Sequence, residues 1–172
     1  ETSFYPCTNR LELKLTGMQG DVMKESMTVA KTLAWNLTMK TRQDEIEKEF
    51  SESCNKGIHI HCPEGAVPKD GPSAGGAITV AIYSLLNNVK VNNEFGMTGE
   101  ISLQGKITAI GGLDLKIIGG IRAGITSFIY PSENSKEFEE FMEKYADNSV
   151  INGIEFIPVK DIEEVLSLVL IN

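Results

Sequence analysis

The chain has 172 residues, and 24 acidic against 16 basic side chains give it a formal net charge of −8. That balance argues against nucleic acid or an anionic membrane as the main partner. Hydrophobic residues make up 41% of the chain, a composition typical of one folded domain of 172 residues and not of a disordered segment.

The cysteine usage, and a sequence without a recognisable targeting signal, indicate an intracellular protein. Three cysteines without CxxC spacing suggest a reducing compartment. The longest mostly apolar run, residues 77–86, has about half the length of a membrane span. The chain starts without Met and without a signal peptide, so we expect a piece of a longer protein.

The first third of the chain predicts a strand, a helix and a polar stretch. Residues 11–16 alternate apolar and polar side chains, which is the period of a strand. Apolar positions from Met23 to Leu37 follow a helical stripe. Residues 40–56 are rich in charge, and we expect a solvated helix end and a loop there.

The middle of the chain predicts a strand, an irregular loop and a helix. Residues 57–62 predict a strand that places His59 and His61 on one face. Residues 63–72 contain three prolines and two glycines, which excludes a regular element. The spacing of apolar residues from 74 to 86 then predicts an amphipathic helix.

The last part alternates strands with helices. We expect a hairpin of strands 95–103 and 106–110, joined at Gln104-Gly105, and then a helix over 112–123. A strand at 126–130, a helix through 138–145, a strand at 154–157 and a helix from Asp161 with Glu164 in a capping box follow. Together, these strands and helices predict an α+β fold with a mixed sheet covered by helices.

Ser73 is a candidate nucleophile. Proline is favoured at the first position of a helix, so Pro72 is expected to place Ser73 in the first turn, beside backbone N–H groups that lack intrahelical partners. The N–H groups of Ser73 and Ala74 would then serve as an oxyanion pocket. Gly75 and Gly76 would let a substrate backbone approach closely. The alternative is that Ser73 merely caps the helix.

A serine nucleophile needs a base, and two kinds are available. His61 with Asp70 would complete a Ser–His–Asp set, although such histidines are more often packing groups, and a metal site at residues 59–64 matches no standard ligand spacing. Lys116 lies on an apolar helical stripe, where burial would favour the neutral amine that a general base needs. Lys69 and Lys106 are expected to be exposed.

Nucleotide-binding motifs are missing from the sequence. The segment from Gly99 to Lys106 has five residues between its glycines where a phosphate loop needs four, and Ile107 stands where Ser or Thr is required. The chain by itself therefore gives no reason to expect ATP.

Several segments resemble the proteolytic domain of Lon proteases. They are 63–66 (PEGA), 68–76 (PKDGPSAGG), 97–100 (MTGE) and 110–113 (IGGL) followed by Lys116, together with 20–26 (GDVMKES) and 158–166. The resemblance runs from about residue 15 to residue 172. It implies an α+β fold similar to the second domain of ribosomal protein S5, and an ATP-dependent serine peptidase.

The resemblance also implies roles for single residues. Ser73 is expected to be the nucleophile and Lys116 the general base, Thr98 a hydroxyl near the lysine, and Asp70 an acidic group that influences whether the site is open. Val67, Gly76 and the pair Asp114-Leu115 depart from the usual pattern without removing a catalytic atom.

The family further implies a homo-oligomeric ring, typically a hexamer, that degrades unfolded, damaged or regulatory proteins in the bacterial cytoplasm or the mitochondrial matrix. ATP and Mg²⁺ would bind an ATPase module outside this chain, and no metal or cofactor is expected within it. The alternative is a non-catalytic module of the same fold that docks substrates or forms the ring.

Overall fold

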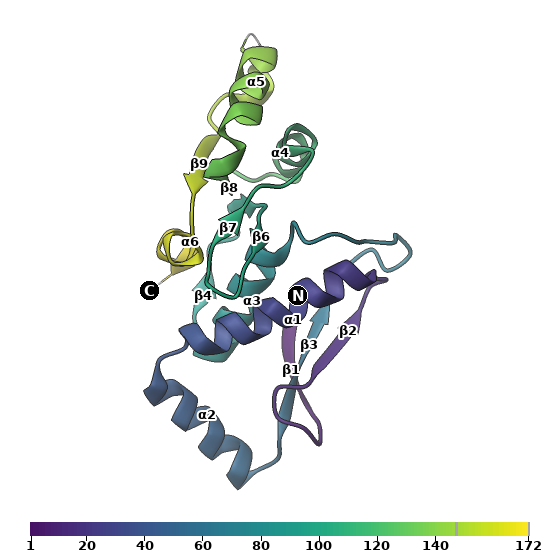
Figure 1. The fold of residues 1–172 in the computed structure, drawn as a ribbon, viewed down its shortest axis with the longest axis vertical. Helices are drawn as coiled ribbons and strands as arrows, with labels where there is room; N and C mark the ends of the chain where they lie inside the picture. The colour runs from purple at the N-terminus through teal and green to yellow at the C-terminus, as the bar shows by residue number, and fades with distance from the viewer. Residues whose placement is uncertain (147, 172) are drawn as a thin grey trace.

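The computed structural model describes residues 1–146 and 148–171, and its fold is α+β (Figure 1). The α-helices are α1 (Asp21–Leu37), α2 (Lys40–Glu52), α3 (Gly75–Asn87), α4 (Leu113–Arg122), α5 (Ser135–Tyr145) and α6 (Ile162–Val169). The strands are β1 (Thr2–Pro6), β2 (Leu13–Thr16), β3 (Lys56–His61), β4 (Lys90–Val91), β5 (Phe95–Met97), β6 (Glu100–Ile101), β7 (Ile107–Thr108), β8 (Ser127–Pro131), β9 (Glu155–Val159) and β10 (Leu170–Ile171). Short 3-10 turns cover Ser132–Asn134 and Ser149–Ile151.

The N-terminal sheet has the order β1-β3-β2 and packs against three helices. β1 runs antiparallel and β2 parallel to the central strand β3. Ile58 and Ile60 of β3 are buried in one cluster with side chains of α1, α2 and α3. The sheet and α2 therefore form one end of the molecule, with α3 near its middle (Figure 1).

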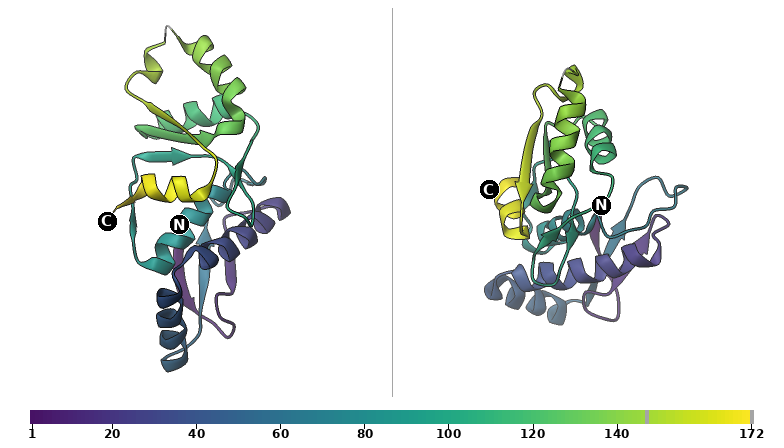
Figure 2. Two further views of the ribbon diagram at one scale, coloured as in Figure 1. Left: turned by 60° about the vertical axis from the view of Figure 1, so that its left-hand side comes forward. Right: turned by 45° about the horizontal axis from the view of Figure 1, so that its top comes forward.

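The second sheet, β5-β8-β9, is parallel and has helices on both faces (Figure 2). Phe128 and Tyr130 of β8 point into a cluster with α4 and α5. Ile129, between them, points into the other cluster with α3 and α6. A strand buried on both faces needs an apolar run, which the fully buried β8 supplies.

Most of the predicted elements are confirmed. The helical stripe from Met23 to Leu37 is α1, the strand at 57–62 is β3, and residues 63–72 are irregular. The capping box of α6 is also present: Asp161 Oδ1 accepts from the Glu164 N–H at 3.0 Å, while Glu164 Oε2 accepts from the Lys160 N–H at 2.8 Å.

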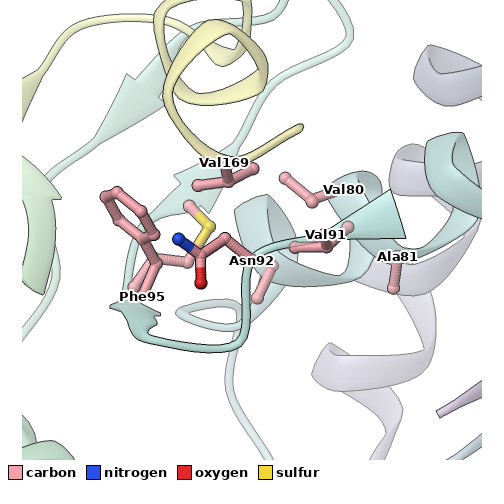
Figure 3. Close-up of a pocket in the computed structure, with 8 residues that line it drawn as sticks. Val80, Ala81, Val91, Asn92, Phe95 and Val169 are labelled. Atoms are coloured by element: carbon pink, nitrogen blue, oxygen red, sulfur yellow. The ribbon is translucent and has the colours of Figure 1, made fainter. Parts of the chain in front are cut away.

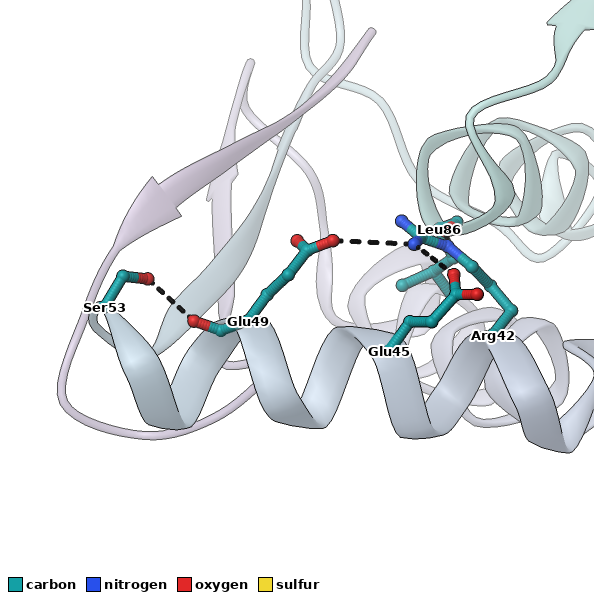
Figure 4. Close-up of polar contacts among 5 residues, drawn as sticks. All are labelled: Arg42, Glu45, Glu49, Ser53 and Leu86. Atoms are coloured by element: carbon teal, nitrogen blue, oxygen red, sulfur yellow. Dashed lines mark hydrogen bonds and ion pairs between the residues drawn. The ribbon is translucent and has the colours of Figure 1, made fainter.

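Residues 40–56 were expected to be a solvated helix end and a loop, and this expectation is wrong. They contain the separate helix α2, which buries Ile46 and Phe50, and the start of β3. Arg42 fixes α2 to the end of α3, because its Nε donates to the Leu86 carbonyl oxygen at 3.0 Å (Figure 4). Its guanidinium also lies 2.9 Å from Glu45 and 3.5 Å from Glu49.

The hairpin at Gln104-Gly105 is confirmed, but its first strand is divided. β6 pairs with β7 across the turn, where Gly105 has a φ of +82°. β5 belongs to the other sheet and pairs with β8. The strands β1, β4 and β10 were not predicted. Within residues 1–146 and 148–171, no helix has the length and hydrophobicity that crossing a bilayer requires.

Candidate active site

Ser73 lies in a turn that precedes α3. The sequence predicted Ser73 in the first helical turn, but α3 begins at Gly75. The Gly75 N–H donates to the Pro72 carbonyl oxygen at 2.9 Å, which closes the turn before the helix starts. The Ser73 side chain is half-buried.

The segment after β5 holds this turn in place. The Ser73 carbonyl oxygen accepts from the Gly99 N–H at 2.8 Å and from Thr98 Oγ1 at 3.2 Å. In return, the Gly76 N–H donates to the Gly99 carbonyl oxygen at 3.1 Å. The Thr98 side chain is buried, with 4% of its residue surface exposed. The backbone of Ser73 is therefore fixed by residues 98–99.

Gly75 and Gly76 serve the packing of the chain on itself. A Cβ at Gly75 would lie 2.6 Å from Ile101 Cγ2 and 2.8 Å from Ser26 Oγ, and one at Gly76 would lie 2.5 Å from Met97 Cε. Both glycines are buried. The expectation that they leave room for a substrate backbone is wrong, because β6 and α1 occupy the space beside Gly75 and β5 occupies that beside Gly76.

Lys116 projects from α4, whose start is set by two backbone features. Gly112, the residue before the helix, has a φ of +68°, which glycine adopts without strain. The buried Asn134 clamps Ile110, two residues before Gly112: its Oδ1 accepts from the Ile110 N–H at 3.0 Å, and its Nδ2 donates to the Ile110 carbonyl oxygen at 2.8 Å. Lys116 itself is half-buried, and its Nζ donates to the Gly111 carbonyl oxygen at 2.8 Å.

Ser73, Thr98 and Lys116 line one pocket. Its volume is about 320 Å³, and apart from these three side chains its wall is small or apolar: Ala74, Ala77, Gly96, Met97, Gly120 and Phe128. Across residues 1–146 and 148–171, no hydrogen bond joins Ser73 to Lys116; the lysine amine is turned to Gly111. The fold thus brings the candidate nucleophile and the candidate base to one cavity without bonding them.

Two backbone donors belong to residues of this pocket. Neither the Ser73 nor the Ala74 N–H donates to a backbone acceptor in the described part of the chain. Both residues line the pocket. Unpaired N–H groups beside a nucleophile are what a developing oxyanion requires.

Asp70 is bound to a different element. Its Oδ1 accepts from the Met23 N–H at 3.0 Å, at the start of α1, and Gly20 leaves the room that its carboxylate fills. The backbone hydrogen bond from Met23, with smaller contributions from Gly71 and Val22 and the nearby charge of Lys24, lowers the pKa of Asp70. Asp70 thus caps α1 and does not line the Ser73 pocket.

The two histidines share one hydroxyl. Thr16 Oγ1 lies 2.9 Å from His59 Nε2 and 2.8 Å from His61 Nδ1, and neither ring lines the Ser73 pocket. Of the described residues, no group of three or more His, Cys, Asp and Glu is arranged to hold a metal ion.

Lys106 is exposed, whereas Lys69 is half-buried and donates to the carbonyl oxygens of Glu64 and Val67.

Sequence reasoning gave no pocket role to Phe128 or Met97, although Met97 belongs to the segment 97–100 that carries the family resemblance. Asn134, which binds Ile110 before α4 and does not line the pocket, was not singled out either. Only the pairing of β5 with β8 brings the first two beside Ser73.

Comparison with known proteins identifies relatives of the chain. The family model of the Lon protease (S16) C-terminal proteolytic domain matches residues 1–172. Lon protease 1 of Bacillus subtilis is 45% identical over 160 residues, which is 93% of this chain and 19% of that protein. The Lon proteases of Brevibacillus choshinensis and Endomicrobium trichonymphae are 45% and 42% identical over 90% and 91% of this chain. The chain therefore spans about a fifth of the length of these relatives.

Proposed function

Because the chain belongs to the family of Lon protease (S16) C-terminal proteolytic domains, we propose that it hydrolyses peptide bonds with Ser73 as nucleophile and Lys116 as general base. One observation carries the proposal: both side chains line the same largely apolar pocket, beside the unpaired N–H groups of Ser73 and Ala74. A hydroxyl, an amine and two N–H donors are the groups that acyl transfer needs.

The reaction begins with a neutral Lys116 amine. Ser73 Oγ attacks the carbonyl carbon of the scissile peptide and passes its proton to Nζ, while the oxyanion is stabilised by the N–H groups of Ser73 and Ala74. The protonated lysine then gives its proton to the departing amine, which leaves an acyl ester on Ser73. Water, deprotonated by the same amine, hydrolyses this ester and restores the serine.

Lys116 has to reach Ser73 from its present position. Its amine is bonded to Gly111, and the four-carbon side chain has the rotational freedom to turn into the pocket. A neutral amine can keep one N–H on the Gly111 carbonyl and direct its lone pair to Ser73.

The wider setting follows from the family and is part of the proposal. We propose that residues 1–172 form a single proteolytic domain that works in a homo-oligomeric ring, a hexamer in the family, inside a bacterial cytoplasm or a mitochondrial matrix. Its substrates would be unfolded polypeptides of damaged or regulatory proteins. Serine acyl transfer needs no cofactor in this chain; ATP and Mg²⁺ would act in the ATPase module of the longer relatives.

The test is cleavage of a fluorogenic peptide by variants of the chain. Ser73→Ala and Lys116→Met should each reduce the rate by at least about 100-fold while the melting temperature stays unchanged. Lys106→Met, an exposed lysine outside the pocket, is the matched control and should cleave normally. A harmless Lys116→Met together with an inactive His61→Ala would contradict the dyad. A chain whose Ser73 never reacts would favour a docking module.

A further inference from the structure

A second, apolar pocket lies directly beside the one that holds Ser73. It has a volume of about 210 Å³ and lies between α3, the segment from β4 to β5 and the end of α6 (Figure 3). Its wall consists of Ala77, Val80, Ala81, Val91, Asn92, Phe95, Met97 and Val169. Asn92 is the polar member of this set, and its Oδ1 already accepts from the Glu94 N–H at 3.0 Å.

The two pockets are contiguous. Ala77 and Met97 line both of them, so these two side chains form the boundary. The sequence predicted Ala77 and Ala81 on the apolar stripe that packs into the core, but both are only half-buried, whereas Val80 and Ile82 are buried. Ala77 therefore lines both pockets, and Ala81 lines the second one, further along α3 from Ser73.

The spacing along the two pockets fits an extended peptide. Ala77 and Ala81 of α3 are four residues apart, and a four-residue step along a helix rises about 6 Å; Ser73 lies in the turn just before this helix. An extended chain advances about 3.3 Å per residue and turns alternate side chains to the same face, so side chains two residues apart are about 6.6 Å apart. The two repeats nearly coincide.

We propose that the pocket between α3, β5 and α6 binds an apolar side chain of the substrate, two residues from the side chain that enters the Ser73 pocket. The inference rests on the proposed peptidase function. The volume equals about seven water molecules at about 30 Å³ each, enough for one large aliphatic side chain. A charged side chain would lose its hydration there without gaining a partner.

The test compares peptides that differ at one position. Each residue on either side of the cleaved bond is changed in turn from alanine to leucine, and kcat/KM is measured. The chain should prefer leucine by about tenfold or more at one position two residues from the residue held in the Ser73 pocket. Ala81→Leu, which fills the second pocket, should remove that preference and leave the preference at the Ser73 pocket intact.

Two further variants keep the test decisive. Val91→Ala enlarges the pocket and should shift the preference at the same position from leucine towards phenylalanine. Ala123→Leu, an exposed alanine outside both pockets, should change neither preference. A leucine preference that Ala81→Leu and Val91→Ala leave unchanged, or no preference two residues away, would overturn the inference.

A binding measurement separates this inference from the peptidase proposal. Fluorescence anisotropy of the labelled peptides with the Ser73→Ala variant reports affinity without turnover. Tighter binding of the leucine peptide, lost when Ala81→Leu is added, would support the pocket even if the wild-type chain cleaved nothing. Equal binding of both peptides would overturn the pocket, even if Ser73 and Lys116 were essential for cleavage.

Discussion

The Thr98 hydroxyl donates a hydrogen bond to the carbonyl oxygen of Ser73 at a distance of 3.2 Å. The same oxygen accepts the Gly99 N–H at 2.8 Å. The turn that presents the proposed nucleophile is thus held by a segment 25 residues further along the chain. Thr98 also lines the pocket that Lys116 lines. It therefore holds the backbone of Ser73 and shares the pocket with the proposed base.

Removing the Thr98 hydroxyl should therefore slow catalysis without unfolding the chain. Thr98→Val keeps the shape of a side chain that is 4% exposed and deletes one hydrogen bond, which is worth about 0.5–1.5 kcal/mol. If that energy holds the turn in its reactive position, kcat falls about 2- to 13-fold. Thr98→Ser keeps the hydroxyl and should retain more activity than Thr98→Val. Equal rates for Thr98→Val and wild type would show that the bond is not needed.

Asp70 should make the stability of the chain depend on pH. Its pKa is lowered in the folded chain, so its contribution is complete above the ordinary value of 3.8 and is lost as the pH falls through the lower folded value. Asp70→Asn should reduce the melting temperature at pH 7, and the gap to wild type should shrink below about pH 4. Asp21→Asn, at the same helix start but with a 98% exposed side chain, should have a smaller effect. A gap that stays constant to pH 2 would contradict this role.

Two glycine-to-alanine substitutions should change stability in opposite directions. Gly75→Ala places a methyl group 2.6 Å from Ile101 Cγ2, and overpacking of this kind costs about 1–3 kcal/mol. Gly119 lies in α4, with no neighbouring atom within 4 Å of an added Cβ, so Gly119→Ala should stabilise by about 0.5–1 kcal/mol. Urea unfolding of both variants checks the pair; a stabilised Gly75→Ala would refute the close packing of α3 on β6.

Asn134 should position Lys116 from a distance. Asn134→Ala leaves the N–H and carbonyl oxygen of Ile110 without their partners, at a cost of about 1–3 kcal/mol for each group that stays buried. Asn134 holds Ile110, and the carbonyl oxygen of the next residue, Gly111, accepts from Lys116 Nζ. The variant should therefore also lower kcat more than it raises KM. Asn36→Ala, an exposed position on α1, should stay within about 0.5 kcal/mol of wild type. A destabilised Asn134→Ala with normal kcat would reduce Asn134 to a purely structural role.

Regular elements with strong periodicity were predictable from the sequence. The stripe of α1, the alternation around Ile58 and the cap of α6 are local patterns, and local patterns determine element type well. α2 has only Ile46 and Phe50 as buried anchors in a charged stretch, so its local pattern is weak. The helix is specified by its contacts with the N-terminal sheet and by the bond from Arg42 to Leu86, which no local pattern reveals.

The start of α3 and the break between β5 and β6 have one common cause. The Ser73 carbonyl would accept a helical N–H if the helix began at Pro72, but Gly99 and Thr98 occupy it instead. The Thr98 N–H still donates to the Ile129 carbonyl oxygen of β8 at 3.1 Å, but the Gly99 N–H donates to Ser73 instead, so pairing with β8 ends here and the predicted strand is divided. A contact between distant segments thus overrides two local preferences at once, and it does so at the proposed active site.

Covalent modification of Ser73 tests the central claim most directly. A fluorophosphonate reagent is added to the wild-type chain and to Lys116→Met, and the modified residue and its rate of formation are measured by mass spectrometry. Attack by Ser73 Oγ releases fluoride, and the serine proton passes to the lysine. We expect one adduct, on Ser73, that forms at least about 100-fold more slowly in Lys116→Met. Equal rates in the two proteins, or an adduct on another serine, would contradict a Ser73–Lys116 dyad.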